Sequence, residues 1–94
     1  MRRRFRRRIL ASIDDRFYKP AGVPMQNLEV VEVSKEDLET IRLRYIKGQD
    51  QTKAATSMGV SQSQYQRDLT DTLYKITEAM VNGKAIRISG RTKS

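Results

Sequence analysis

Hydroxyl, amide and guanidinium side chains recur between residues 61 and 70 at a spacing that would place them on one face of a helix. A glutamine amide can make two hydrogen bonds to adenine and an arginine two to guanine, while serine and threonine hydroxyls suit a phosphate or either base. The face is uncharged apart from Arg67. We therefore interpret it as a surface that contacts nucleic acid.

The side-chain chemistry of this surface predicts a role for each residue. Three residues are expected to contact base edges: Gln62, Gln66 and Arg67. Four others are expected to lie near a phosphate or either base: Ser61, Ser63, Thr70 and Lys53. The two serines are placed near phosphate because the backbone N–H groups at the amino end of a helix attract anions.

Ala55 and Gly59 predict the turn that would position this surface. Two helices that cross tightly need a small residue at the crossing, and Ala55 supplies it. Gly59 stands where the first helix should end, and glycine adopts a positive φ without steric cost. With Asp50 and Ser61 as caps, the pattern predicts a helix-turn-helix with helices at about 51–58 and 62–81. The alternative is an ordinary helical hairpin.

Apolar spacing predicts which helix faces are buried. Ser34 and Asp37 approximate a capping box at the start of a helix over about 35–47, which Gly48 should end. The inward stripe of this helix is expected to be Leu38, Ile41, Tyr45 and Ile46. The short second helix should bury Ala54, Ala55 and Met58. The long last helix should bury Tyr65, Leu69, Leu73, Ile76 and Met80.

Two short segments outside the helices are typical of β-strands. Residues 28–33 are rich in β-branched side chains, and residues 85–89 alternate between apolar and polar. The two segments can pair, within the chain or across a dimer. The expected fold class is therefore mainly α, a three-helix helix-turn-helix domain with a long last helix and a short β pairing.

Charge divides the chain into a nearly neutral middle and two basic ends. The 94 residues include 19 basic and 11 acidic side chains, a net charge of +8. Six arginines lie near the start: Arg2, Arg3, Arg4, Arg6, Arg7 and Arg8. We predict a basic arm over 1–16, a DNA-binding domain over 17–90 and a tail over 91–94. Unpaired basic ends suit a polyanion, because each neutralised phosphate releases a counterion; a solubilising tail is the alternative.

Several classes of function are disfavoured by what the sequence lacks. It has no cysteine and no histidine, which removes disulfides, thiolate zinc sites and the commonest general base and metal ligand. The acids at 14–15 and 36–37 are sequence neighbours that diverge on a helix or strand, so neither pair makes a metal cage. We expect no enzymatic activity, cofactor or metal. No apolar run approaches the ~20 residues of a membrane span, so we expect a cytoplasmic, nucleoid-associated protein with no membrane contact.

Three segments carry a family resemblance. They are Phe-Tyr-Lys-Pro-Ala-Gly-Val-Pro at 17–24, Lys-Glu-Asp-Leu-Glu-Thr-Ile-Arg-Leu at 35–43 and Val-Asn-Gly-Lys-Ala-Ile-Arg-Ile at 81–88. With the expected helix-turn-helix, the chain resembles over residues 17–90 the prokaryotic family of uncharacterised predicted DNA-binding proteins called domain of unknown function 134. Its helical part, 34–81, is also similar to region 4 of bacterial sigma factors. The resemblance implies a DNA-binding, regulatory protein.

The leading hypothesis is therefore a transcriptional regulator that binds double-stranded DNA sequence-specifically, as a homodimer. A homodimer is expected because one short helix reads few base pairs and two-fold pairing doubles the site. One alternative is a protein-interaction module of the transcription machinery, with RNA polymerase as a possible contact. Another is non-specific nucleic-acid binding through the arginine arm, which extends to RNA although the arm has only one aromatic residue, Phe5.

Overall fold

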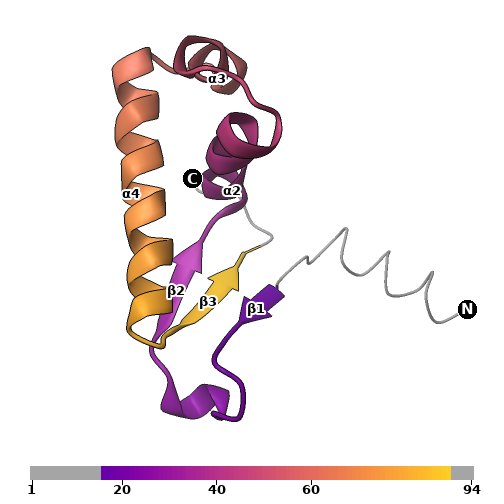
Figure 1. Cartoon of the computed structure of the whole chain (residues 1–94), viewed down its shortest axis with the longest axis vertical. Coiled ribbons are helices and arrows are strands. Elements are labelled where there is room, and N and C mark those ends of the chain that lie inside the picture. Colours follow the sequence, from indigo (N-terminus) through magenta and orange to yellow (C-terminus); the bar gives the residue numbers. More distant parts are fainter. Residues whose placement is uncertain (1–15, 90–94) are drawn as a thin grey trace, which may run out of the picture.

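The computed structural model describes residues 16–89, which form three helices and a three-stranded sheet. The helices are α2 (Lys35–Ile41), α3 (Gln51–Met58) and α4 (Gln62–Val81), and the strands are β1 (Arg16–Tyr18), β2 (Val30–Val33) and β3 (Ala85–Ile88). A 3-10 turn at Met25–Asn27 follows the proline-rich connection after β1. In Figure 1, α4 runs the length of the molecule, with α2 and α3 beside its amino-terminal half and the sheet beside its carboxy-terminal half. The expected bounds of α3 and α4 are confirmed.

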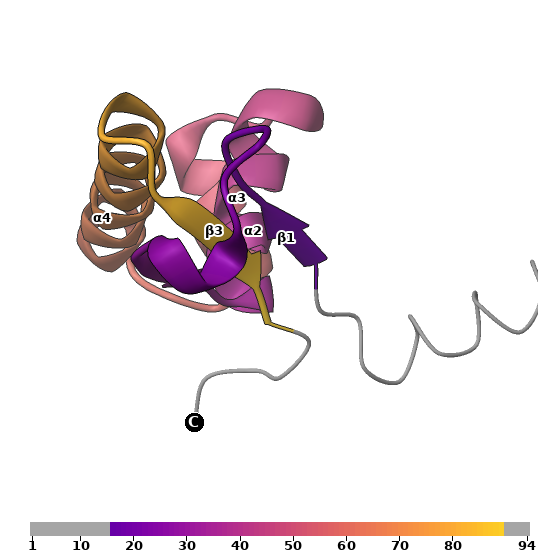
Figure 2. The same ribbon diagram turned by 90° about the horizontal axis from the view of Figure 1, so that it is seen from below.

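The sheet has the strand order β1-β3-β2. β2 and β3 run parallel, with Val31 opposite Ile86, so the predicted pairing of these segments is confirmed within the chain. β1 pairs antiparallel with β3, with Phe17 opposite Arg87, and forms the edge farthest from α4 (Figures 1 and 2). The sequence did not predict β1, because its three side chains are all exposed and show no alternation. Arg16 therefore belongs to the sheet and not to the predicted arm.

Two apolar clusters hold these elements together, and α4 contributes to both. The first cluster joins the segment that follows α2 (Arg42–Ile46) to α3 and the amino-terminal half of α4; its buried members are Leu43, Ala54, Ala55, Tyr65 and Leu69. The second joins the sheet to the carboxy-terminal half of α4; its buried members are Val33, Ala79, Ile86 and Ile88. The expected burial of Ala54 and Ala55 is confirmed, and Met58 packs against the first cluster.

The buried face of α4 departs from its expected stripe at the carboxy-terminal end. Tyr65 and Leu69 are buried, and Leu73 and Ile76 pack against the clusters as expected. Met80 is 66% exposed, so the prediction for it is wrong. Ala79 is buried instead, in contact with the cluster formed by β2 and β3. The small side chain of Ala79 lets the sheet approach α4 closely. Because Ala79 points toward the sheet, the next residue, Met80, points toward solvent.

The segment after α2 contains a second departure from the expected stripe. Residues Arg42–Ile46 form a π-helical turn, in which the Lys47 N–H donates to the Arg42 carbonyl oxygen at 2.9 Å. The buried positions of this region are Asp37, Thr40 and Leu43, which follow one another at intervals of three residues, whereas Tyr45 and Ile46 are 57% and 77% exposed. The predicted stripe is wrong for both of these residues.

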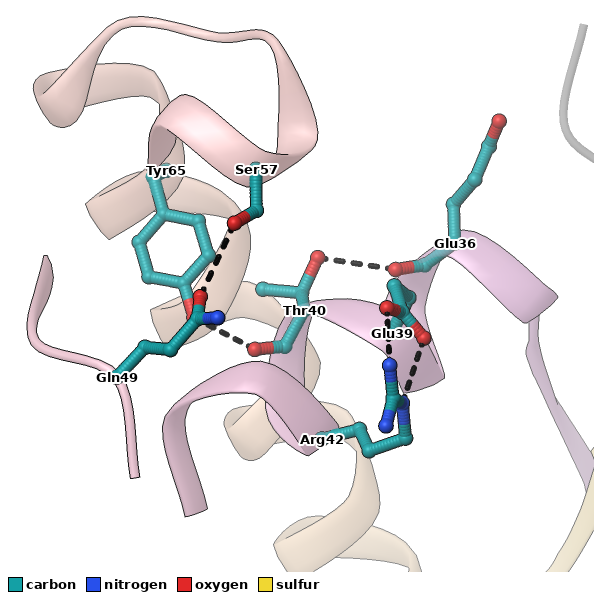
Figure 3. Close-up of polar contacts among 7 residues, drawn as sticks. All are labelled: Glu36, Glu39, Thr40, Arg42, Gln49, Ser57 and Tyr65. Atoms are coloured by element: carbon teal, nitrogen blue, oxygen red, sulfur yellow. Dashed lines mark hydrogen bonds and ion pairs between the residues drawn. The ribbon is translucent and has the colours of Figure 1, made fainter. Parts of the chain in front are cut away.

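Polar contacts fix α2 against the rest of the molecule. Ser34 and Asp37 form the predicted capping box, with reciprocal hydrogen bonds of 3.0 and 3.1 Å. The Lys75 ammonium of α4 lies 3.1 Å from the Asp37 carboxylate and donates to the Glu32 carbonyl oxygen at 3.0 Å. On the outer side of α2, hydrogen bonds from Arg42 lower the pKa of the Glu39 carboxyl (Figure 3).

One buried hydrogen bond joins α4 to α2. The ring of Tyr65 is fully buried, and its hydroxyl donates to the Thr40 carbonyl oxygen at 2.6 Å (Figure 3). Burial raises the pKa of the Tyr65 phenol, so the hydroxyl stays protonated and remains a donor at neutral pH. This bond sets both the depth and the rotation of α4 relative to α2.

We expect Tyr65→Phe to lower the free energy of unfolding by about 1–3 kcal/mol, because it removes the donor to a buried carbonyl. Chemical denaturation monitored by circular dichroism would measure this loss. Tyr74→Phe is the matched control: Tyr74 is on the same helix and 69% exposed, so its loss should stay within about 0.5 kcal/mol. Equal losses in the two variants would contradict a structural role for the Tyr65 hydroxyl.

Candidate nucleic-acid interface

Two capped helices and a short turn position the candidate interface. The Asp50 carboxylate accepts a hydrogen bond from the Lys53 N–H at 2.8 Å at the start of α3. The Ser61 hydroxyl accepts one from the Gln64 N–H at 3.1 Å at the start of α4. Both predicted caps are therefore confirmed. Each satisfies a backbone donor that the first turn of a helix leaves without a partner.

The turn between α3 and α4 depends on Gly59. This residue has φ 73° and ψ 28°, in the left-handed region. The Val60 N–H donates to the Ala55 carbonyl oxygen at 3.0 Å, and the Gly59 N–H donates to the Thr56 carbonyl oxygen at 3.0 Å. These bonds close the end of α3 while Val60 packs against the first cluster. A Cβ at Gly59 would meet no atom within 4 Å, so glycine is favoured here by the backbone conformation alone.

All seven residues predicted to contact nucleic acid have exposed side chains. Five of them lie in the first half of α4: Gln62, Ser63, Gln66, Arg67 and Thr70. At about 100° per residue, these five positions span roughly 140° of the helix surface and so form one face. Ser61 stands at the end of this face, and Lys53 lies in the first turn of α3. No acidic residue lies among the seven.

The structure adds Gln51 to the residues of the candidate interface; the sequence pattern did not indicate it. The Gln51 side-chain amide, on α3, donates from Nε2 to Oε1 of Gln66, on α4. The Gln66 amide in turn donates from Nε2 to the Thr70 hydroxyl at 3.0 Å. Gln51 has no apolar periodicity or capping role that would have identified it. Its position as the first residue of α3, beside the helix that carries the face, was the available signal.

A second set of contacts positions Arg67. Its Nη2 donates to Oε1 of Gln64 at 2.8 Å, and Nε2 of Gln64 donates to the Asp68 carboxylate at 2.8 Å. Gln64 therefore separates the arginine from the acid. A guanidinium carries five N–H donors, so this contact leaves most of them available to a ligand.

The described part of the chain supplies few charges to this face. Lys53 and Arg67 are the basic residues among the seven, and the predicted arm arginines, Arg2, Arg3, Arg4, Arg6, Arg7 and Arg8, lie outside residues 16–89.

Within residues 16–89, no group of three His, Cys, Asp or Glu side chains is placed to hold a metal ion. No helix in the same range has the length and apolar character needed to span a membrane.

The interface thus belongs to a small, mainly helical domain with a capped α3–turn–α4 unit and a three-stranded sheet. The chain belongs to the family described as protein of unknown function DUF134, which it matches over residues 1–93. Its relatives are UPF0251 proteins of prokaryotes. No solved structure gives a significant match to the chain.

Three relatives illustrate how far the similarity extends. A UPF0251 protein of Methanocella arvoryzae is 40% identical over 90 residues, which cover 96% of this chain and 54% of that protein. One from Dehalococcoides mccartyi is 43% identical over 74 residues, covering 79% and 63% respectively. One from Moorella thermoacetica is 45% identical over 74 residues, covering 79% and 50%. The chain therefore spans between half and two thirds of the length of these curated relatives.

We expect Gly59→Ala to lower the free energy of unfolding by about 1–2 kcal/mol, the cost of placing a Cβ in the left-handed region. Gly59→Asn is the matched variant and should lose less, because asparagine tolerates this conformation. Denaturant unfolding of the two variants beside wild type measures the difference. Equal losses for alanine and asparagine would argue that something other than backbone conformation governs the turn.

Proposed function

We propose that this protein binds double-stranded DNA sequence-specifically through α3 and α4, which act as a helix-turn-helix, and that it regulates transcription. The observation that carries the proposal is the outward face of α4. The five residues of this face, at 62, 63, 66, 67 and 70, are all polar and exposed, and none of them is acidic. These are the side-chain types that bind base edges and phosphates in the major groove.

The proposed docking places the first half of α4 in the major groove. There, Gln62 and Gln66 bind adenines, and Arg67 binds a guanine. Phosphates are contacted by Ser61, Ser63, Thr70 and Lys53. α3 lies across the groove behind α4, where its buried alanines let the two helices approach closely. As a whole, α4 is about 30 Å long, so its second half extends away from the DNA and is available to contact the sheet.

The arginine arm has a different task in this proposal. With Lys53 and Arg67 as the basic residues of the face, much of the sequence-independent affinity is assigned to the six arginines near the start of the chain. Each arginine that neutralises a phosphate makes binding more salt-dependent. We further propose that the protein binds a two-fold symmetric site as a homodimer and that it is associated with the nucleoid in the cytoplasm. Its helix-turn-helix is proposed to contact DNA as region 4 of bacterial sigma factors does.

Selection of bound sites from random duplexes tests specific DNA binding. We expect an enriched sequence, and a palindromic one if the protein binds as a dimer. In the Gln66→Ala, Arg67→Ala double variant, discrimination at the affected positions should fall by about 1–3 kcal/mol for each bidentate interaction removed. Thr77→Ala, an exposed threonine farther along α4, is the control and should keep the wild-type preference.

Deletion of residues 1–8 separates general affinity from specificity. The shortened protein should bind all duplexes more weakly, and the slope of log K against log salt should flatten by about 0.9 for each phosphate that the arm no longer neutralises. The selected sequence should stay the same. The proposal is wrong if wild type shows no sequence preference and the deletion abolishes binding altogether.

A protein-interaction module remains the second candidate, because one specific observation favours it. Ile46 is 77% exposed and, with Leu38, Ile41 and Met58, forms the apolar part of a groove of about 580 Å³ whose lining also includes five charged residues. The proposed partner is RNA polymerase. Purified polymerase should then bind the wild-type protein after nuclease treatment, and Ile46→Ser should weaken this binding without changing the selected DNA sequence.

A further inference from the structure

We infer that Gln51, on α3, is a positioning residue that sets the base preference of Gln66 on α4. The inference rests on the proposed function, because it assumes that Gln66 contacts a base. It concerns a residue outside the exposed face of α4. Gln51 acts through the amide of Gln66 and needs no contact with a base itself.

The contacts hold the Gln66 amide from both ends. Gln51 is the first residue of α3, and its Nε2 donates to Oε1 of Gln66, the fifth residue of α4. On the other side, Nε2 of Gln66 donates to the Thr70 hydroxyl at 3.0 Å, one helical turn farther along α4. The two contacts come from different helices, so the amide orientation depends on the α3–α4 packing as well as on α4.

This arrangement leaves Gln66 the hydrogen-bonding capacity needed for adenine. A glutamine amide has two lone pairs on oxygen and two N–H donors. The Gln51 and Thr70 contacts use one lone pair and one donor, so one of each remains. Adenine offers an N6 donor and an N7 acceptor in the major groove, and it needs both remaining groups at once. The Gln51 contact fixes the position of the amide oxygen, and the Thr70 contact fixes that of the amide nitrogen. Gln66 therefore presents its remaining acceptor and donor to DNA in a fixed order.

Gln62 provides a comparison within the same helix. It is also exposed and is proposed to contact a base, but its side chain has no hydrogen-bond partner within residues 16–89. Its amide must therefore be ordered on binding, which costs conformational entropy, whereas that of Gln66 is ordered beforehand. Removal of the Gln51 amide should alter recognition at the Gln66 position and leave the Gln62 position unchanged.

Base-by-base competition binding on the selected site tests the inference. Gln66→Ala should reduce the preference for the favoured base at one position by about 5- to 150-fold, as expected for one bidentate contact. We expect Gln51→Ala to reduce the preference at the same position by at least threefold and to leave other positions within twofold. The Gln51→Ala, Gln66→Ala double variant should lose no more preference than Gln66→Ala alone.

Gln51→Glu gives a result that a merely structural role would not produce. A carboxylate accepts but does not donate, so the Gln66 NH₂ must turn toward it and the carbonyl toward the Thr70 hydroxyl, which can donate. The order of donor and acceptor presented to DNA is then reversed, and the preferred base at this position should change. Thr52→Glu adds the same charge at the neighbouring exposed residue. It should weaken binding to all sequences but keep the base preference.

Thr70→Val provides an independent route, because it removes the other anchor of the Gln66 amide without touching α3. It should reduce the preference at the same position as Gln51→Ala. If Gln66→Ala changes the base profile while Gln51→Ala and Thr70→Val both keep that of wild type, the positioning role is wrong and the proposed function stands. If wild type shows no preference that depends on Gln66, the base-reading role of Gln66 and this inference fail together. Circular dichroism of each variant confirms that it is folded.

Discussion

The burial of Tyr65 is the constraint on which the rest of the structure depends. Its ring is fully enclosed and its hydroxyl is bound to the backbone of α2, so α4 can neither slide nor rotate without breaking a buried hydrogen bond. Successive side chains on a helix diverge by about 100°, so fixing Tyr65 and Leu69 inward turns the residues on the opposite side outward. The chemistry of the exposed face is therefore determined by what is packed beneath it.

The small side chains of α3 extend the same constraint. Ala54 and Ala55 let α3 pack directly against the amino-terminal half of α4, and the left-handed Gly59 turns the chain within a few residues. This close packing brings the start of α3 within hydrogen-bonding reach of Gln66. In the proposed function α3 is accordingly more than a support, because its first side chain helps to determine what α4 presents to DNA.

The sequence predicted the features that depend on neighbouring residues along the chain. The caps at Ser34, Asp50 and Ser61 and the turn at Gly59 were correct, because each depends on hydrogen bonds that span at most five residues along the chain. Predictions that depended on distant partners were incomplete. The exposure of Ile46 accompanies a first helix that turns the polar residues Asp37 and Thr40 toward partners on α4, and the exposure of Met80 accompanies the contact between Ala79 and the sheet. β1 exists through pairing with β3, which lies about 70 residues away. The outward positions of α4 are exposed as expected, but Gln51 was missed because its partner comes from another helix.

The distribution of charge gives the proposed function its physical form. A face with two basic residues gains little from Coulomb attraction, which is screened beyond about 10 Å at 0.1 M salt. Its contribution must come from hydrogen bonds, whose energy depends on donor and acceptor geometry and so on the identity of the base. The arginine arm has the opposite properties, because a guanidinium bound to a phosphate gains the same energy on any sequence. In the proposed function, specificity therefore depends on the α3–α4 packing, whereas general affinity does not.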